Sequence, residues 1–326
     1  MKAAIVQSAG APPVYGDIDA PTATGTKVVV NVTAAALSSL TKMRASGTHY
    51  SSTSACPFVP GFDGVGTVAG SGERVYFAFP DAAYGALGQQ ALVDKASLRS
   101  IPDDLDDVTA ASVANPGMSA WASMVHRAHI AKGETVLING ATGTAGKLAI
   151  QLAKELGAGK VIATARNAQQ LEELKAVGAD VTIAFNLTDG EAEFKKAVAA
   201  EFKQNGCKGI DIIIDYLYGP STEAILASIP GNLADGHRVR YVNVGTAAGV
   251  PEIPISAALL RSSALELMGS GLNSVTEATL LDSIAEVFKV AARLKLDVDA
   301  TSVPLKDISQ AWAQKGAKPR LVVVMQ

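Results

Sequence analysis

Apolar and polar positions follow a repeating pattern between residues 133 and 270 of this chain. Short apolar runs are typical of buried strands, and the stretches between them carry apolar residues at helical spacing. Strand and helix in regular alternation predict a parallel sheet with helices on both faces. The predicted strands are Thr135–Asn139, Lys160–Ala165, Val181–Ala184, Ile210–Asp215, Arg238–Val244 and Ala264–Gly269. The predicted helices between them include Ala168–Val177, Glu191–Lys203 and Thr222–Ser228.

The segment up to about residue 120 has a β-rich and loop-rich pattern instead. Lys27–Val32 is a β-branched strand, and Val65–Val68 pairs with Arg74–Phe79 around Gly70-Ser71-Gly72. Met1–Gln7 becomes polar too early for a signal peptide and is predicted to be an edge strand. The pattern therefore predicts a separate, β-rich first domain.

The C-terminal part begins with a long amphipathic helix at Val275–Leu294. A strand, a short helix at Leu305–Lys315 and a last strand at Leu321–Met325 are predicted after it. The last strand contains three consecutive valines, and we expect it to return to the first domain.

A glycine-rich turn joins the strand that ends at Asn139 to the helical pattern that begins at Lys147. Glycines spaced three apart let the backbone turn tightly, and the helix behind them offers unpaired N–H groups to a pyrophosphate. The alternative is a tight turn of a parallel sheet that binds nothing. The predicted cofactor-binding residues here are Gly140, Ala141, Thr142, Gly143, Thr144, Ala145 and Gly146.

The end of the next strand indicates which dinucleotide is bound. An NAD-preferring unit has an acid about 20 residues past the glycines, whereas this chain has Ala165, Arg166 and Asn167 there. The Arg166 guanidinium can grip a 2′-phosphate that a carboxylate would repel. We therefore predict NADPH with Arg166 and Asn167 in its site, the alternative being that Arg166 is only a surface residue.

Ligands of parallel sheets lie outside the carboxyl ends of the strands, which adds further candidates. For the glycines among them, the alternative is turn geometry alone. Tyr218 belongs to a segment with two tyrosines, and we expect it to stack on the substrate or the cofactor ring. The predicted residues at these strand ends are Asn186, Tyr218, Val244, Gly245, Gly269 and Ser270.

Composition narrows the class of protein. The 326 residues suffice for two domains, and 48% hydrophobic with 18% charged residues excludes a disordered chain. The net charge of −3 and the absence of a Lys/Arg block argue against binding to nucleic acid or to an anionic membrane. Cys56 and Cys207 form neither a disulfide framework nor a zinc site, and idle thiols in a reducing cytoplasm are expected.

Three motifs resemble those of one enzyme superfamily. They are the Pro-Gly turn at Pro57–Val68, the Gly-Glu-Arg-Val strand at Gly72–Val75, and Gly-Met-Ser-Ala-Trp at Gly117–Trp121. With the spacing of the glycine turn, they resemble the medium-chain dehydrogenase/reductase superfamily, in particular its zinc-free quinone oxidoreductase (zeta-crystallin-like) group. The resemblance covers essentially the whole chain.

The resemblance implies an α/β protein with two domains. A GroES-like β-rich catalytic domain would comprise residues 1–120 plus 262–326, and a Rossmann doubly wound parallel-sheet domain would bind NADPH within 121–261. Members of this group often form dimers through an edge strand of the nucleotide domain, so a homodimer is expected.

The metal positions of the zinc members are not retained. Where those members have a His-Glu pair, this chain has Phe62-Asp63, and the cysteine cluster of the structural zinc lobe is missing. His126 and His129 lie three apart on a predicted helix without a third ligand, and a surface or capping role is expected for them. We therefore predict no metal, because tetrahedral zinc needs about four N, S or O ligands.

A zinc-free site must polarise the acceptor oxygen by hydrogen bonds, and Ser38, Tyr50 and Ser119 are the candidate donors. Many quinone reductases have an asparagine and an acid where this chain has Ser38 and Thr41. Each donor has a structural alternative, because Ser38 can cap a helix, Ser119 can cap a helix that starts there, and Tyr50 can pack at a domain interface.

The implied activity is hydride transfer from NADPH to a quinone or another α,β-unsaturated carbonyl compound, a small hydrophobic electrophile. One alternative is a zinc-free alcohol or carbonyl dehydrogenase, which is disfavoured because unactivated carbonyls usually need a Lewis acid or a protonated donor. The other is an NADPH-binding sensor or interaction protein with little turnover, for which the residues at Ser38 and Thr41 are the best support.

Overall fold

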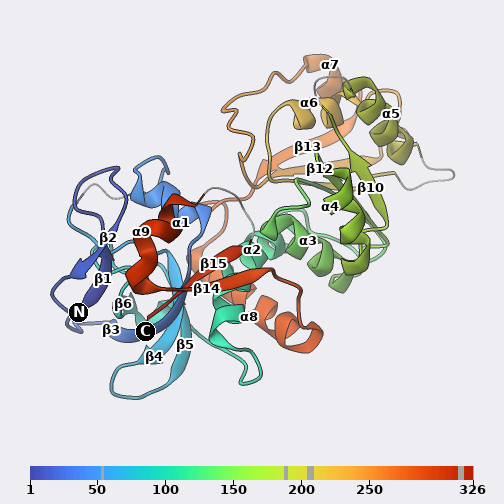
Figure 1. Cartoon of the computed structure of the whole chain (residues 1–326). Helices are drawn as coiled ribbons and strands as arrows, with labels where there is room; N and C mark the ends of the chain where they lie inside the picture. The colour runs from blue at the N-terminus through green and yellow to red at the C-terminus, as the bar shows by residue number, and fades with distance from the viewer. Residues whose placement is uncertain (53–54, 187–189, 204–208, 315–318, 326) are drawn as a thin grey trace. The chain divides into compact units, whose positions relative to one another are not determined.

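The computed structural model describes residues 1–52, 55–186, 190–203, 209–314 and 319–325. Two compact units divide the chain. The terminal unit contains Met1–Asn115 and Leu281–Gln326, and the central unit contains Pro116–Leu280. Both ends of the chain therefore belong to one unit, as the blue and red segments of Figure 1 show.

The terminal unit is built mainly of strands. Its first elements precede the central unit along the chain, and its last elements follow it. They are β1 (Lys2–Ile5), β2 (Val14–Asp17), β3 (Lys27–Ala36), α1 (Ser39–Ala45), β4 (Asp63–Val68), β5 (Arg74–Ala78), β6 (Gln90–Asp94), η1 (Lys95–Ser97), β7 (Leu98–Ser100), α2 (Asp107–Trp121), α8 (Glu277–Leu294), β14 (Ala300–Pro304), η4 (Leu305–Asp307), α9 (Ile308–Ala313) and β15 (Arg320–Val324). Helices α2 and α8 cross the division between the two units.

Strand β3 organises the sheet of the terminal unit. The strand order is β14-β15-β3-β4-β5-β7, and β6 also pairs with β3. The valines of β15 pair antiparallel with the alanines at the end of β3, which confirms that the last strand returns to the first domain. Gly66 of β4 lies so close to β3 that a Cβ there would be 2.1 Å from the Asn31 carbonyl oxygen. The core contains Val30, Phe77, Leu87 and Val323.

The central unit alternates strands with helices. Its elements are η2 (Ala122–Arg127), β8 (Thr135–Asn139), α3 (Thr144–Glu155), β9 (Lys160–Ala165), α4 (Ala168–Glu173), η3 (Leu174–Val177), β10 (Val181–Ala184), α5 (Glu191–Phe202), β11 (Ile212–Asp215), α6 (Pro220–Ala227), β12 (Arg238–Asn243), α7 (Ala257–Arg261) and β13 (Ala264–Gly269).

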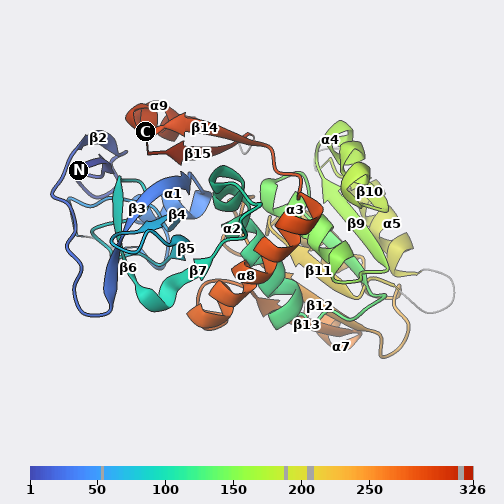
Figure 2. The ribbon, with the colours of Figure 1, turned by 90° about the horizontal axis from the view of Figure 1, so that it is seen from below.

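The six strands of the central unit form one parallel sheet in the order β10-β9-β8-β11-β12-β13. Figure 2 shows β9 and β10 beside α4 and α5. The order reverses between β8 and β11, which is the switch point where doubly wound sheets bind ligands. The predicted parallel sheet is therefore confirmed, with its core formed by Leu137, Ile162, Phe194, Ile213 and Ile225.

Several predicted boundaries differ from those of the structure. Four predicted strands match residue for residue, whereas β11 begins two residues later and β12 ends one residue earlier than expected. The predicted helix Ala168–Val177 is divided into α4 and a 3-10 turn that ends at Gly178 in the left-handed conformation. The end of the helix predicted at Leu305–Lys315 lies outside the described residues.

The largest correction concerns the segment before residue 121. It was expected to be β-rich and loop-rich with a helix beginning near Ser119, but α2 begins at Asp107. The Asp106 carboxylate accepts a hydrogen bond from the Thr109 N–H at 2.9 Å and caps this helix. Ser119 lies in its last turn, so the structural alternative that Ser119 caps a helix start is wrong.

Among the residues that the structure describes, no helix is long and apolar enough to cross a membrane.

Candidate functional site

The turn between β8 and α3 holds the backbone close to the helix. Gly140 has φ = +88°, and its N–H and that of Ala141 both donate to the Thr164 carbonyl oxygen at 3.0 Å. A Cβ on Gly146 would lie 2.5 Å from the Gly140 carbonyl oxygen, so only glycine allows this approach. Gly146 therefore has the packing role that the motif assigns to its last glycine.

The N-terminus of α3 presents unused backbone donors. Gly143 is the N-cap, and the Lys147 N–H makes the first bond of the helix to its carbonyl oxygen. The N–H groups of residues 144–146 precede that bond and have no acceptor within the helix. A Cβ on Gly143 would have only the Gly140 carbonyl oxygen at 3.6 Å within contact distance, so the space beside this glycine is open. The turn can thus admit an anionic group.

The end of β9 supplies a positive charge one strand away from this turn. Arg166 follows β9 directly, is exposed, and forms no ion pair with any described residue. The neighbouring Asn167 has a structural function, because its side chain caps α4 by accepting from the Gln170 N–H at 3.0 Å. Of this predicted pair, the structure leaves Arg166 accessible to a phosphate.

Asp215 organises the loop after β11, a role that the sequence analysis missed. It is fully buried, and Oδ1 accepts hydrogen bonds from the Asn139 side chain at 2.9 Å and from the backbone of Leu217 and Tyr218. Its Oδ2 accepts from Thr222 at 2.5 Å and from the Tyr241 hydroxyl at 2.7 Å. The sequence did contain a signal for this role. Asn139 and Asp215 are polar residues that each end an apolar strand, which places both side chains at the switch point.

The loops after β11 and β12 contain three predicted residues. Tyr218 has φ = +50°, a strained conformation for a tyrosine, and its N–H is held by Asp215. The N–H groups of Val244 and Gly245 both donate to the Asp215 carbonyl oxygen, and a Cβ on Gly245 would lie 2.8 Å from the Tyr216 carbonyl oxygen. The close approach of the Tyr216 carbonyl oxygen therefore requires a glycine at Gly245.

The remaining predicted residues lie at outer strand ends. The Ser270 N–H donates to the Asn243 carbonyl oxygen at 2.8 Å, and the Gly269 carbonyl oxygen accepts from Arg127 at 2.8 Å. A Cβ on Gly269 would have only one atom within 4 Å, at 3.9 Å. Asn186 lies two residues after β10, beyond the middle of the sheet.

Ser119 and Tyr216 are both half-buried residues of the central unit. Ser119 donates to the Pro116 carbonyl oxygen at 2.9 Å within α2. The Tyr216 hydroxyl is buried, and burial raises the pKa of Tyr216, an effect that Ser119 opposes. Ser119 therefore belongs to a different unit from Ser38 and Tyr50.

In the terminal unit, Ser38 is the N-cap of α1. Its hydroxyl accepts from the Thr41 N–H at 3.0 Å and donates to Thr41 Oγ1 at 3.0 Å, so its one hydrogen is already used. Tyr50 is 65% exposed, and its ring lies 4.0 Å from that of His49. Of the two candidate donors in this unit, Ser38 is committed to the helix cap and Tyr50 reaches solvent.

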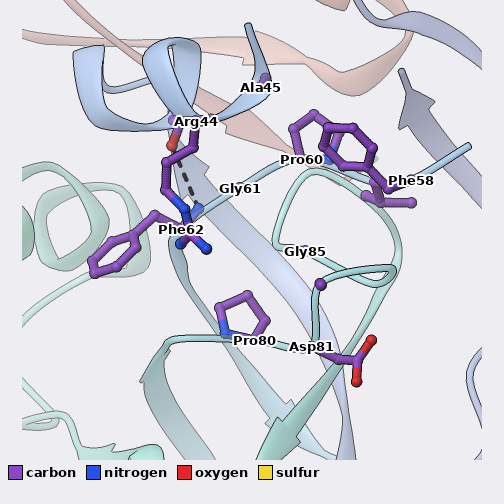
Figure 3. A pocket seen from close by; sticks show the side chains of 12 residues that line it. Arg44, Ala45, Phe58, Pro60, Gly61, Phe62, Pro80, Asp81 and Gly85 are labelled. Carbon is purple, nitrogen blue, oxygen red and sulfur yellow. Dashed lines mark hydrogen bonds between the residues drawn. The ribbon is translucent and has the colours of Figure 1, made fainter. Parts of the chain in front are cut away.

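A small pocket lies beside α1 and the Pro-Gly turn (Figure 3). Arg44 extends from α1, and its guanidinium lies 5.6 Å from the centre of the Phe62 ring. Thr41 lies in the wall and receives the Phe62 N–H at 3.4 Å. Lining residues are Thr41, Arg44, Ala45, Phe58, Val59, Pro60, Gly61, Phe62, Pro80, Asp81, Ala82 and Gly85.

The residues at the metal position of zinc dehydrogenases do not fit a zinc ion. Phe62 is buried and offers no lone pair, and Asp63 is buried behind it with a hydrogen bond from the Tyr76 hydroxyl at 3.0 Å. No three His, Cys, Asp or Glu side chains of the described residues are grouped to hold a metal. Cys56 is an exposed free thiol, and Cys207 lies outside the described residues.

Arg320, at the start of β15, is a charged neighbour of Asp63. Burial raises the pKa of Asp63 to about 6, against the opposing charge of Arg320 and the bond from Tyr76. In the part of the chain that the structure describes, Asp63 Oδ1 and Arg320 Nε and Nη2 are buried without a hydrogen-bond partner.

Comparison with known proteins shows which families and enzymes this chain is similar to. Residues 145–286 match the family model described as zinc-binding dehydrogenase. The chain is 26% identical to "Probable NADPH-dependent quinone reductase tdiC" of Emericella nidulans, with 100% of both chains covered. It is 26% identical to the human protein named quinone oxidoreductase, covering 100% of this chain and 98% of that one.

A solved structure shares both architecture and sequence with the chain. The quinone oxidoreductase of Thermus thermophilus, reported with its NADPH complex, has a TM-score of 0.78 and 26% identity, with 100% of both chains covered. The similarity therefore extends over both units and not only over the parallel sheet.

Proposed function

We propose that this chain, which belongs to the medium-chain dehydrogenase/reductase superfamily, reduces quinones or other α,β-unsaturated carbonyl compounds with NADPH and without zinc. The observation that carries the proposal is the α3 N-terminus, where unused N–H groups and a glycine with open space lie one strand away from the exposed Arg166. The relatives named above support the reaction class.

The residues at this edge of the sheet fit the two charged parts of NADPH. The N–H groups of residues 144–146 would hold the pyrophosphate, and Arg166 would hold the 2′-phosphate with paired, charge-assisted hydrogen bonds. No acid lies next to Arg166 in the sequence to repel that phosphate. Asp215 holds the loop containing Tyr218, which we propose lies beside the nicotinamide.

When bound, NADPH supplies the hydride for the electron-poor double bond. The chain's part is to position the acceptor and exclude water, since Phe62 and Asp63 form no set of zinc ligands with other described residues. A quinone or enone is already electrophilic, so neutral donors suffice and solvent can supply the proton. Tyr50 remains our first candidate donor, because Ser38 has used its hydrogen in the α1 cap.

The first experiment is NADPH oxidation followed by near-ultraviolet absorbance, with para-benzoquinone and a simple enone as acceptors and NADH in parallel. We expect turnover with both acceptors and a strong preference for NADPH. Tight NADPH binding without turnover against a broad panel would overturn the reductase proposal in favour of a sensor. Reduction of unactivated ketones alone would favour the carbonyl dehydrogenase alternative.

Arg166→Ala tests the cofactor assignment directly. We expect the KM for NADPH to rise about 10- to 100-fold, because a charge-assisted bidentate contact is lost, while the KM for NADH stays the same. Lys132→Ala is the matched control, since it removes one exposed cation from the same unit before β8 begins. Equal effects on both cofactors would show that Arg166 is only a surface residue.

We also propose a homodimer that joins through β13, the edge strand of the central sheet. Leu267 on this strand and Leu260 on the preceding helix are 40% and 45% exposed. Light scattering should give twice the 33.4 kDa chain mass, and Leu267→Lys should reduce that mass to the monomer.

A further inference from the structure

The pocket beside α1 contains a guanidinium with unused hydrogen-bonding capacity. Arg44 Nε donates to the Ser51 carbonyl oxygen at 3.2 Å, whereas its two Nη groups have no acceptor among the residues that the structure describes. The group is half-buried against the Phe62 ring, and this burial lowers the pKa of Arg44. A cation with reduced hydration and a free bidentate edge is suited to a carboxylate.

Thr41 supplies a second donor to the same pocket. Its Oγ1 accepts from the Ser38 hydroxyl at 3.0 Å and from the Phe62 N–H at 3.4 Å. Both bonds use oxygen lone pairs, so the hydrogen of the Thr41 hydroxyl remains, with no acceptor in the described part of the chain. Thr41 is buried but lines the pocket, so this hydrogen is available to a ligand there.

The pocket's charge balance favours an anion. Its one acidic lining residue, Asp81, points away from Arg44 in Figure 3. The Asp81 carboxylate is neutralised by Lys27 Nζ at 2.6 Å and accepts the Ala83 N–H at 3.0 Å. The remaining lining side chains are uncharged, which leaves Arg44 as the uncompensated charge of the pocket.

The pocket's size selects a small group. Its volume is about 30 Å³, which compares with roughly 10–15 Å³ needed for one water molecule on the same measure. Two oxygen atoms of a carboxylate fit this space, whereas an aromatic ring does not. The pocket can therefore hold a substituent of the substrate and not the reacting ring or double bond itself.

We propose that this pocket makes the protein selective for electron-poor acceptors that carry a carboxylate, which Arg44 binds with help from Thr41. The inference rests on the proposed reductase function and adds a substrate class to it. For an unsaturated keto acid, the hydride from NADPH adds to the carbon β to the ketone, and a solvent proton adds to the α carbon. The products are the saturated keto acid and NADP⁺, and the carboxylate itself is unchanged.

A matched pair of acceptors tests the selectivity. 3-Benzoylacrylate and its methyl ester share the reacting enone and differ in charge, so their kcat/KM ratio reports on the carboxylate contact. We expect Arg44→Met to lower the acid-to-ester ratio about 10- to 100-fold and Arg44→Lys to lower it less. Lys95→Met is the control, because it removes an exposed cation of the terminal unit outside the pocket and should leave the ratio unchanged.

A binding measurement separates this inference from the reductase proposal. Calorimetry should show that 3-benzoylpropionate, the saturated product, binds to the wild-type protein. Arg44→Met should weaken this affinity by roughly 10-fold or more, because one charged hydrogen bond is lost. An unchanged kinetic ratio and equal binding by both proteins would overturn the carboxylate pocket while leaving the reductase proposal intact. If no acceptor is reduced, the reductase proposal fails, and the binding result alone decides whether the pocket takes a carboxylate.

Discussion

Two buried aspartates, one in each unit, have opposite surroundings. Asp215 in the central unit receives five hydrogen bonds at its two carboxylate oxygens. Asp63 in the terminal unit receives one, from Tyr76, and its other oxygen has no partner among the described residues. Burial alone therefore does not determine how a carboxylate behaves, because the donors around it decide whether its charge is stabilised.

The difference between the two aspartates corresponds to a difference in function. Beside Asp215, the backbone of the loop that we assign to the cofactor is held by hydrogen bonds from the Tyr218 N–H to Asp215 and from the Gly219 N–H to Thr222. At Asp63, only one of the two carboxylate oxygens has a hydrogen-bond donor among the described residues. Arg320 lies close to this carboxylate without a direct bond to it. The first arrangement defines a geometry, and the second makes the terminal unit sensitive to pH.

The largest effect is expected from removing the better-bonded carboxylate. Asp215→Ala leaves the donors of Asn139, Thr222 and Tyr241 without their acceptor, which should lower the unfolding free energy by about 3–5 kcal/mol. Chemical denaturation monitored by circular dichroism measures the loss. A change below about 1 kcal/mol would show that the network does not hold the loop.

The Asp63 carboxyl predicts a pH dependence of stability. Its pKa is about 6 in the folded protein, against 3.8 for an aspartate in water, so the unfolded chain loses this proton first as pH rises. Stability from this group is therefore present below pH 3.8 and decreases up to about pH 6, by a total of about 3 kcal/mol.

Asp63→Asn isolates that contribution, because the amide cannot ionise. Urea unfolding between pH 4 and 7 should show a steeper fall for the wild-type protein than for the variant. Parallel curves for the two proteins would contradict the assignment of the pH dependence to Asp63.

The smallest effects are expected from removing one donor at each aspartate. Tyr76→Phe removes the single bond to Asp63 and should cost about 2 kcal/mol, whereas Tyr241→Phe leaves Asp215 with four donors and should cost about 1 kcal/mol. Both rings are buried, so the matched pair compares hydroxyls and not ring packing. Thermal unfolding at pH 7 measures both variants, and a larger loss for Tyr241→Phe would reverse our comparison.

The sequence predicted the central unit well because its signals are local. Apolar strands bounded by glycine and polar residues determine both the limits of β8 and β9 and their place in a parallel sheet. The glycine motif also predicted the tight turn between β8 and α3, since that turn depends on neighbouring residues. Helix α2 was missed because Pro116 and Gly117 in its interior conceal a helical pattern that Asp106 begins.

The clusters of the terminal unit could not be predicted, because they join distant parts of the sequence. Asp63, Tyr76 and Arg320 come from β4, β5 and β15, and strand order and register bring them together. Arg44 reaches Phe62 only through the packing of α1 on the Pro-Gly turn. The sequence alone does not indicate that the Nη groups of Arg44 lack an acceptor among the described residues.

The pairing of β15 with β3 has a consequence for biosynthesis. The central unit is one continuous stretch, so a ribosome can release all of it while the C-terminal strand of the terminal unit is still untranslated. Until then the end of β3, Ala34–Ala36, lacks the strand that pairs with it, and a neighbouring nascent chain could pair there instead. Synthesis of β15 (Arg320–Val324), which pairs with the end of β3, is thus the step that covers this edge.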